Sequence, residues 1–364
     1  MTRPSSPIPR KSSALASASS ALQWAIKKSW RWLLGLLGLV LAWHALKGVD
    51  WTTVWDLLNN LSPFAISIFV VINLFMLPLM NARWWLLLRS LGEPVGLLPL
   101  CIYRIAANAV NYLTPGPHFG GEPLSVYLLH NRQGTSLSSA ATSVAVDRLL
   151  EVLASFLVLT LCLMTLTFVE SGPLKGSHGL FFVVAILAGL TWILSALFAG
   201  RRPLSRSLLL LIRLYRRSFP SLSNTKGSLT GIIVQGEILA ESLFREHRYH
   251  FLLANLFSLG HWFAIFAEFW LMSFFLGYPL SFLQLTAVVV VARLAFFTPL
   301  PAGIGVLETA LPWITATLEL GNGLGLSLCL IIRCRDLLFS LVGLVLTMKY
   351  LTWQGKAGII NVKR

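Results

Sequence analysis

Two glycine- and proline-rich breaks interrupt the apolar stretches of this sequence, and they constrain its fold more than any other feature. The first runs from Asn111 to Glu122 and the second from Phe297 to Glu308. Each contains Thr-Pro, then glycine, then a glutamate. Helix-breaking backbone within membrane-type sequence is tolerated only where protein or a water-filled cavity covers its polar groups. Each break is therefore a candidate binding site.

The composition is that of a membrane protein. Of the 364 residues, 56% are hydrophobic and only 12% are charged. The formal charge of +15 reflects basic residues between apolar stretches, where they orient spans and contact anionic lipid headgroups. We therefore expect no nucleic-acid partner. The four cysteines lack metal-type spacing, so we expect neither disulfides nor zinc, and no cofactor.

The apolar segments predict an all-α polytopic membrane protein with about six full transmembrane helices and two re-entrant helical hairpins. A bilayer core of about 30 Å requires about 20 helical residues, and the apolar pieces beside each break are too short to span it. The predicted spans are about 32–46, 63–88, 137–168, 179–199, 251–276 and 323–348. The hairpins comprise residues 97–111 with 123–130, and 282–296 with 306–318.

The distribution of charge predicts the domain organisation and the orientation. Residues 1–29 are expected to be a disordered basic tail, 30–350 the membrane domain and 351–364 a second tail. Residues 201–250 are expected to be a cytoplasmic region that contains an amphipathic helix. Basic residues favour the cytoplasmic side, so we place both termini in the cytoplasm and the protein in the cell (inner) membrane.

The sequence also contains an internal repeat, with unit one at about 63–168 and unit two at about 251–348. Shifts of 184 to 186 residues align the less common residue types: Trp85 with Trp270, Pro94 with Pro279, Glu122 with Glu308 and Arg148 with Arg333. Two full spans in a unit return the chain to its starting side. The single linking span, 179–199, therefore predicts an inverted repeat, which is a recurrent transporter design.

The motif Pro115 to Glu122 with Asp147-Arg148, and the motif Pro301 to Glu308 with Arg333, resemble the paired motifs of the lysylphosphatidylglycerol synthase transmembrane region. This family is also called flippase-like. The resemblance covers roughly residues 30–350 and implies lipid translocation. Full synthases carry a soluble aminoacyl-transfer domain after the membrane part. Because this sequence ends at Arg364, shortly after its last predicted span, we expect no aminoacyl transfer.

Arg148 and Arg333 are the main candidate substrate-binding residues. At about 1.5 Å per residue each lies about 15 Å into its span, from opposite faces, where an unpaired charge costs about 2.5–3.5 kcal/mol or more. We expect them to converge near the hairpin tips and to bind a lipid phosphate, which suits the guanidinium fork. The alternative is a structural ion pair: Arg148 with Glu122 or Asp147, and Arg333 with Glu308 or Asp336.

Glu122 and Glu308 are candidates because they recur at repeat-related positions near the start of a half-helix. They are expected either to gate or couple protons, or only to cap the helix, since its N-terminal dipole favours a carboxylate. Backbone N–H groups at the same ends could bind phosphate.

Three polar residues of the breaks are weaker candidates. Thr114 and Thr298 are expected to shape the turns. Asn111 either hydrogen-bonds a headgroup or satisfies broken backbone.

Charged residues elsewhere in the spans complete the candidate set. Asp147 and Glu151 share a helical face and are expected to neutralise Arg148. Arg104 and Arg293 do not coincide under the repeat, so we expect them at interfaces or in packing.

The sequence leaves three functions open. The first is transport of an anionic, headgroup-modified or polyprenyl-phosphate lipid. The second is a membrane enzyme that modifies a lipid, although we find no HExxH motif, Asp/His cluster or nucleotide-binding loop, and so expect no enzyme. The third is a non-transporting accessory subunit of an envelope or glycolipid pathway. A homodimer or a synthase partner is compatible with each of them.

Overall fold

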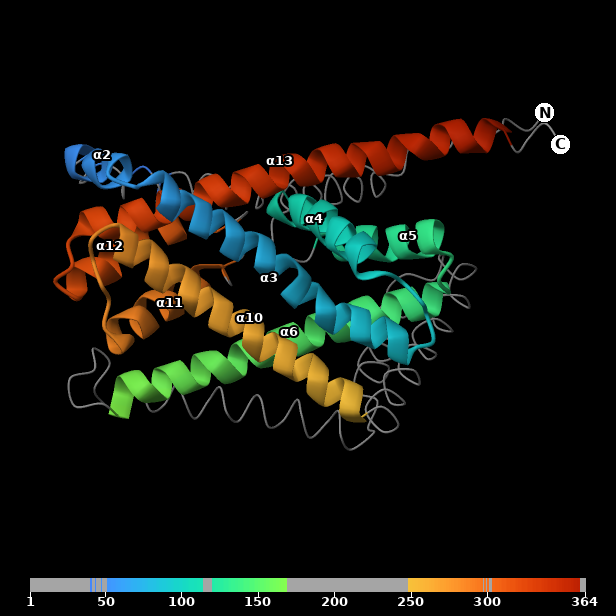
Figure 1. The fold of residues 1–364 in the computed structure, drawn as a ribbon, viewed down its shortest axis with the longest axis horizontal. Coiled ribbons are helices and arrows are strands. Elements are labelled where there is room, and N and C mark those ends of the chain that lie inside the picture. Colours follow the sequence, from blue (N-terminus) through green and yellow to red (C-terminus); the bar gives the residue numbers. More distant parts are fainter. Residues whose placement is uncertain are drawn as a thin grey trace, which may run out of the picture.

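The computed structural model describes residues 51–113, 120–168, 248–296 and 303–360, with isolated positions 40, 43, 47, 298 and 300. Within these residues the protein is all-helical, as predicted, and no strand occurs (Figure 1). The helices are α2 (Trp51–Asn59), α3 (Pro63–Ser90), α4 (Leu97–Leu113), α5 (Glu122–Gln133), α6 (Leu137–Phe168), α10 (Arg248–Phe275), α11 (Phe282–Phe296), α12 (Val306–Thr317) and α13 (Asn322–Ile360).

The helix bounds follow the apolar segments closely. Helix α6 coincides with the predicted segment 137–168, and α4 and α5 lie on either side of the first break, as α11 and α12 lie on either side of the second. Helix α13 continues beyond its predicted end at 348 to Ile360. The predicted spans 32–46 and 179–199, and most of the region 201–250, lie outside the described residues.

Three described helices are long and apolar enough to cross a membrane. They comprise Pro63–Ser90, Leu137–Thr167 and Leu252–Phe275. Helix α13 is longer but is not one of them, and it carries three charged residues in its middle, Arg333, Arg335 and Asp336. The protein is therefore a helical membrane protein, whereas six spans and two hairpins remain a prediction.

Local sequence signals set the ends of α3 and α10. Helix α3 begins where the Ser62 hydroxyl accepts a hydrogen bond from the Ala65 N–H, with Pro63 in the first turn. It ends at Ser90, two residues before Gly92, whose φ of +77° is the left-handed conformation that closes a helix C-terminus. Helix α10 likewise ends at Phe275, two residues before Gly277, where φ is +87°.

The two halves of the chain have corresponding helices. Helices α10, α11 and α13 each begin 185 residues after α3, α4 and α6 respectively. Helices α3 and α10 pack against each other and run in opposite directions, and α6 and α13 also run in opposite directions (Figure 1). The packing crosses between the halves, because α4 contacts α13 and α11 contacts α6.

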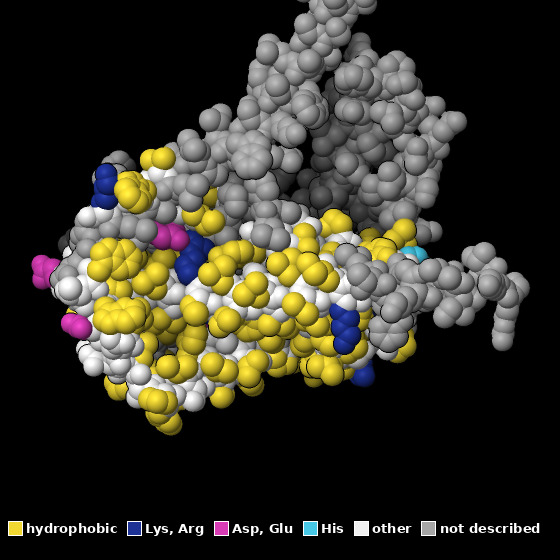
Figure 2. Space-filling view, turned by 90° about the horizontal axis from the view of Figure 1, so that it is seen from above, with side chains coloured by type: hydrophobic (Ala, Val, Ile, Leu, Met, Phe, Trp, Pro, Cys, Tyr) yellow, Lys and Arg dark blue, Asp and Glu magenta, His cyan; other side chains and the backbone are white. Residues whose placement is uncertain are grey.

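Apolar side chains fill the interior and also cover the outside. Leu307, Leu311 and Val288 are fully buried in the core formed around α10 to α13. Large apolar side chains such as Phe64 and Phe263 are instead exposed, and Figure 2 shows a face that is mostly hydrophobic with few charged groups. A surface of this kind is suited to contact with lipid chains.

Candidate functional site

A cavity of about 510 Å³ lies between α3, α4, α6, α10, α11 and α13. Its wall combines apolar side chains with four arginines and three carboxylates: Arg104, Arg148, Arg293, Arg335, Glu151, Glu268 and Asp336. A volume of this size accommodates a small molecule or a lipid headgroup. The wall draws on helices from both halves of the chain.

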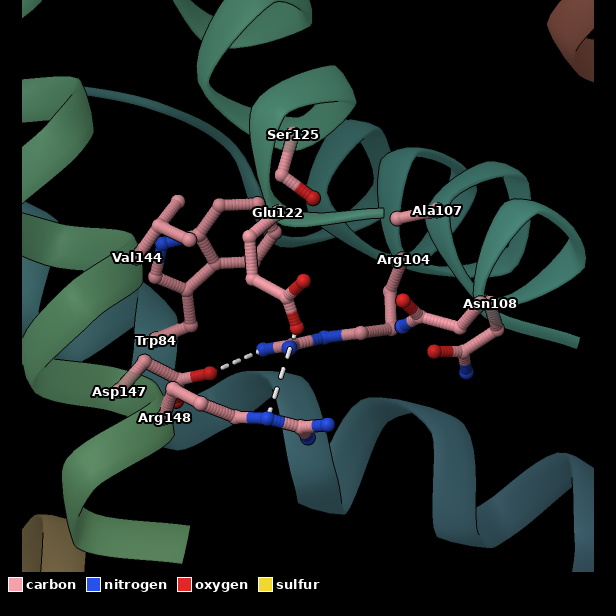
Figure 3. Close-up of a pocket in the computed structure, with 10 residues that line it drawn as sticks. Trp84, Arg104, Ala107, Asn108, Glu122, Ser125, Val144, Asp147 and Arg148 are labelled. Carbon is pink, nitrogen blue, oxygen red and sulfur yellow. Dashed lines mark hydrogen bonds and ion pairs between the residues drawn. The ribbon is translucent and has the colours of Figure 1, made fainter. Parts of the chain in front are cut away.

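Beside this cavity, the end of the first break forms a compact cluster (Figure 3). Glu122 projects from the start of α5, and its carboxylate lies 3.5 Å from the Arg148 Nε. Arg104 pairs with Asp147 in the same cluster. The Glu122 Oε2 atom is buried without a hydrogen-bond partner, beside a space of about 10 Å³. That space is close to the smallest that holds a water molecule.

Arg148 pairs with one of the two carboxylates of α6 that were expected beside it. Its Nη1 donates a hydrogen bond of 2.9 Å to Glu151, whereas Asp147 pairs with Arg83 at 2.7 Å and with Arg104. Of the two carboxylates expected to neutralise Arg148, Glu151 therefore pairs with it, and Asp147 pairs with two other arginines. Adjacent residues on a helix point in different directions, whereas residues three apart share a face.

Arg333, at the second break, is held by several groups. Its Nε and Nη2 donate to the two oxygens of Glu308, at 2.7 and 3.1 Å, and Nη2 also donates to the Gly303 carbonyl at 3.1 Å. Glu308 in turn accepts from the Gly305 N–H at 2.7 Å, which caps α12. The ion-pair alternative for Arg333 is therefore present, with Glu308 rather than Asp336 as the partner.

The expected convergence of Arg148 and Arg333 near the hairpin tips remains a prediction, because most tip residues lie outside the described residues. Arg148 lines the 510 Å³ cavity, whereas Arg333 is not among its lining residues. Arg333 lies on the part of α13 that faces α12, and Arg335, two residues further along, turns toward the cavity. A separation of two residues on a helix rotates a side chain far from its neighbour.

The sequence did not predict the ion pair between Arg335 and Glu268, both of which line the cavity. Arg335 lies 2.5 Å from Glu268 and 2.9 Å from Asp336, and Glu268 also accepts a hydrogen bond from the Asn73 amide at 3.0 Å. The sequence signal was an ionisable residue at mid-helix in α10, which is costly unless it is paired. Arg104 and Arg293, which we expected in packing, also line the cavity.

Two weaker candidates shape the breaks. The Asn111 side-chain oxygen accepts hydrogen bonds from the Gly120 and Gly121 N–H groups, at 2.6 and 2.5 Å. Of its two expected roles, Asn111 therefore takes that of satisfying the broken backbone. The Thr298 hydroxyl donates to the Ala295 carbonyl at 2.7 Å, so the expected turn role is confirmed. Thr114 lies outside the described residues.

Gly121 allows a close approach of the start of α5 to α4. A Cβ atom at this position would lie 2.1 Å from the Ala107 carbonyl oxygen, so any larger side chain would force α4 and α5 apart. The first break therefore depends on glycine at this position for packing.

Within the described residues, no group of three His, Cys, Asp or Glu side chains is placed to hold a metal ion, and the four cysteines are free thiols. The cavity wall itself carries guanidinium and carboxylate groups. Such groups bind anions and exchange ion-pair partners.

Comparison with known proteins identifies a family whose profile covers most of the chain. The profile of the family described as the lysylphosphatidylglycerol synthase TM region matches residues 31–343, which confirms the resemblance of the two motifs. A UPF0104 membrane protein of Methanothermobacter thermautotrophicus is 32% identical over 93 residues. That stretch covers 26% of this chain and 28% of the relative. No solved structure matches the chain.

Proposed function

The chain belongs to the lysylphosphatidylglycerol synthase transmembrane family, and from this premise we propose that it is a lipid transporter. Its substrate is a lipid with an anionic, headgroup-modified or polyprenyl-linked phosphate. The headgroup enters the 510 Å³ cavity from the side, passes the arginines, and leaves on the other face of the membrane.

The observation that carries this proposal is the charged wall of the cavity. Four arginines and three carboxylates surround it, although the helices that form it are largely apolar. Ionisable residues at membrane depth are costly and are candidates for a substrate pathway. The ion pairs also allow the headgroup to move through the cavity. The lipid phosphate can replace a carboxylate as the partner of Arg148, and the carboxylate can later displace the phosphate.

The relation between the halves supports a transport cycle. Arg83 and Asn73 of α3 correspond, at a shift of 185 residues, to Glu268 and Ser258 of α10. Arg83 donates a hydrogen bond to Ser258, and Asn73 donates one to Glu268, so each contact is matched by its repeat-related counterpart. With the opposite directions of α3 and α10, this favours an inverted repeat whose halves exchange conformations.

Arg148→Gln tests the proposal in reconstituted vesicles. The vesicles contain fluorescent phosphatidylglycerol, and dithionite quenches only the label on the outer leaflet. We expect the variant to translocate at least tenfold more slowly than the wild type, because the glutamine cannot hold the phosphate by charge. Arg89→Gln is the matched control, since Arg89 is exposed and stacks on Trp85 at 4.1 Å, away from the cavity.

Two outcomes would contradict the proposal. One is translocation by Arg148→Gln at the wild-type rate while the protein is folded. The other is a wild-type protein that moves no labelled lipid but converts it to a covalent product, which would favour the lipid-modifying enzyme.

A further inference from the structure

Arg293, near the end of α11, differs from the other arginines of the cavity wall. Its guanidinium lies over the Trp262 ring, 5.3 Å from the centroid, and its Nε is buried without a hydrogen-bond partner. No carboxylate of the described residues lies within 4.0 Å of it, whereas Arg104, Arg148 and Arg335 each have one. The cavity therefore contains a cation that the described residues leave without a counterion.

The carboxylates nearest to Arg293 in the cavity are committed to other cations. Glu268 and Asp336 both pair with Arg335, at 2.5 and 2.9 Å. Glu151 pairs with Arg148 at 2.9 Å and lies 3.4 Å from Arg83. An unpaired guanidinium at this depth is costly, and an anionic ligand in the cavity would remove that cost.

A second cavity, of about 820 Å³, adjoins the first and is almost entirely apolar. Six residues line both cavities: Asn73, Leu77, Ile105, Glu268, Arg335 and Phe339. A charged compartment next to an apolar compartment matches the two parts of an amphiphile. A free anion would gain no binding free energy from the apolar compartment.

We propose that Arg293 is the anion-binding residue of a lipid site that occupies both cavities. The phosphate of an anionic lipid headgroup lies against the N–H edge of Arg293, and an acyl or isoprenoid chain lies in the 820 Å³ cavity beyond the Arg335–Glu268 pair. Trp262 holds the guanidinium plane, which leaves its donors for two oxygens of the phosphate. This inference rests on the proposed function, which it extends by naming the holding residue.

The test is calorimetric binding of dioctanoyl phosphatidylglycerol to the purified full chain in detergent. We expect Arg293→Gln to weaken binding at least tenfold, and Arg89→Gln, a surface arginine that also stacks on tryptophan, to change it by less than twofold. Dioctanoylglycerol, which lacks the phosphate, should bind wild type and Arg293→Gln equally. Unchanged affinity of a folded Arg293→Gln for phosphatidylglycerol would overturn the proposal.

Inorganic phosphate distinguishes a lipid site from a site for a free anion. We expect it to bind at least tenfold more weakly than dioctanoyl phosphatidylglycerol, because it gains nothing from the apolar compartment. If it binds as tightly as the lipid, the ligand is a free phosphate and the lipid assignment is wrong.

A measurement on the wild type keeps the test valid if Arg293→Gln does not fold. Phenylglyoxal modifies accessible arginines, and peptide mass spectrometry reports each position. We expect dioctanoyl phosphatidylglycerol to slow the modification of Arg293 at least threefold and that of Arg89 not at all. Equal modification of Arg293 with and without lipid would count against the site.

Transport separates this inference from the proposed function. If the wild type binds the lipid through Arg293 but does not translocate it, the transporter proposal fails and the site stands. If Arg293→Gln binds and translocates at wild-type levels, the site fails and the transporter stands.

Discussion

The two breaks place repeat-related arginines beside repeat-related glutamates, yet the two pairs differ. Arg333 and Glu308 form a pair with two hydrogen bonds, and their side chains are only 12% and 14% exposed. Arg148 lies 3.5 Å from Glu122, shares Glu151 with Arg83, and faces the cavity. The second pair is therefore the more tightly hydrogen-bonded and the less exposed of the two. Repeat symmetry therefore predicts where a residue lies, but not what it does.

The largest effect should come from Arg333→Ala. Removing this guanidinium leaves the Glu308 carboxylate buried with a lost partner, and we expect the free energy of unfolding to fall by about 3–5 kcal/mol. Arg148→Ala should cost less, about 1–2 kcal/mol, because its partners are more exposed. Unfolding in mixed micelles, followed by circular dichroism, measures both.

A double-mutant cycle controls this comparison. Arg333→Ala combined with Glu308→Ala should be less destabilised than the sum of the single variants, because neither charge is then left alone. Equal losses for Arg333→Ala and Arg148→Ala would mean that the two breaks are equivalent after all.

The glycines of the breaks should give the next largest effect. Gly121→Ala forces a methyl group to within 2.1 Å of the Ala107 carbonyl, and we expect a loss of about 2–3 kcal/mol. Gly303→Ala meets the Ala295 carbonyl at 3.1 Å with φ at +62°, which should cost about 1–2 kcal/mol. Melting temperatures in detergent rank the variants.

Gly96→Ala is the matched control for both glycines. Its added methyl group would lie 3.4 Å from Pro99, in ordinary contact, so the melting temperature should hardly change. A tolerated Gly121→Ala would show that α4 and α5 can separate without cost.

We expect the smallest losses of stability from substitutions of the polar side chains in the breaks. Asn111→Ala removes the acceptor of two backbone N–H groups and should cost about 1–2 kcal/mol. Thr298→Ala removes one donor to a carbonyl and should cost about 0.5–1 kcal/mol. The same thermal unfolding assay applies, and a larger loss for Thr298→Ala would reverse the comparison.

The helices could be predicted from the sequence because their ends carry strong local signals. Pro63 after Ser62, and glycines such as Gly92 and Gly277, fix where the backbone starts and stops a helix, and the observed bounds of α3 and α10 follow them. The breaks were visible for the same reason. These signals act over a few residues and do not depend on the packing partner.

The ion pairs could not be predicted to the same degree, because they depend on how each helix is rotated in the bundle. Asp147 and Arg148 are adjacent in sequence, yet they bind different partners. Arg293 and Arg335 have cavity-facing side chains only because α11 and α13 pack as they do. The sequence identifies the charged residues within apolar segments, whereas the packing of the helices determines which of them form ion pairs.

Arg83 and Glu268 occupy equivalent positions in the two halves, and they carry opposite charges. An assembly of two separate, identical polypeptides would have to place the same residue at both positions, so that both would be arginine or both would be glutamate. Joining the halves in one polypeptide removes that restriction. Each half can then change on its own, so a substitution such as arginine in one half and glutamate in the other is available to selection.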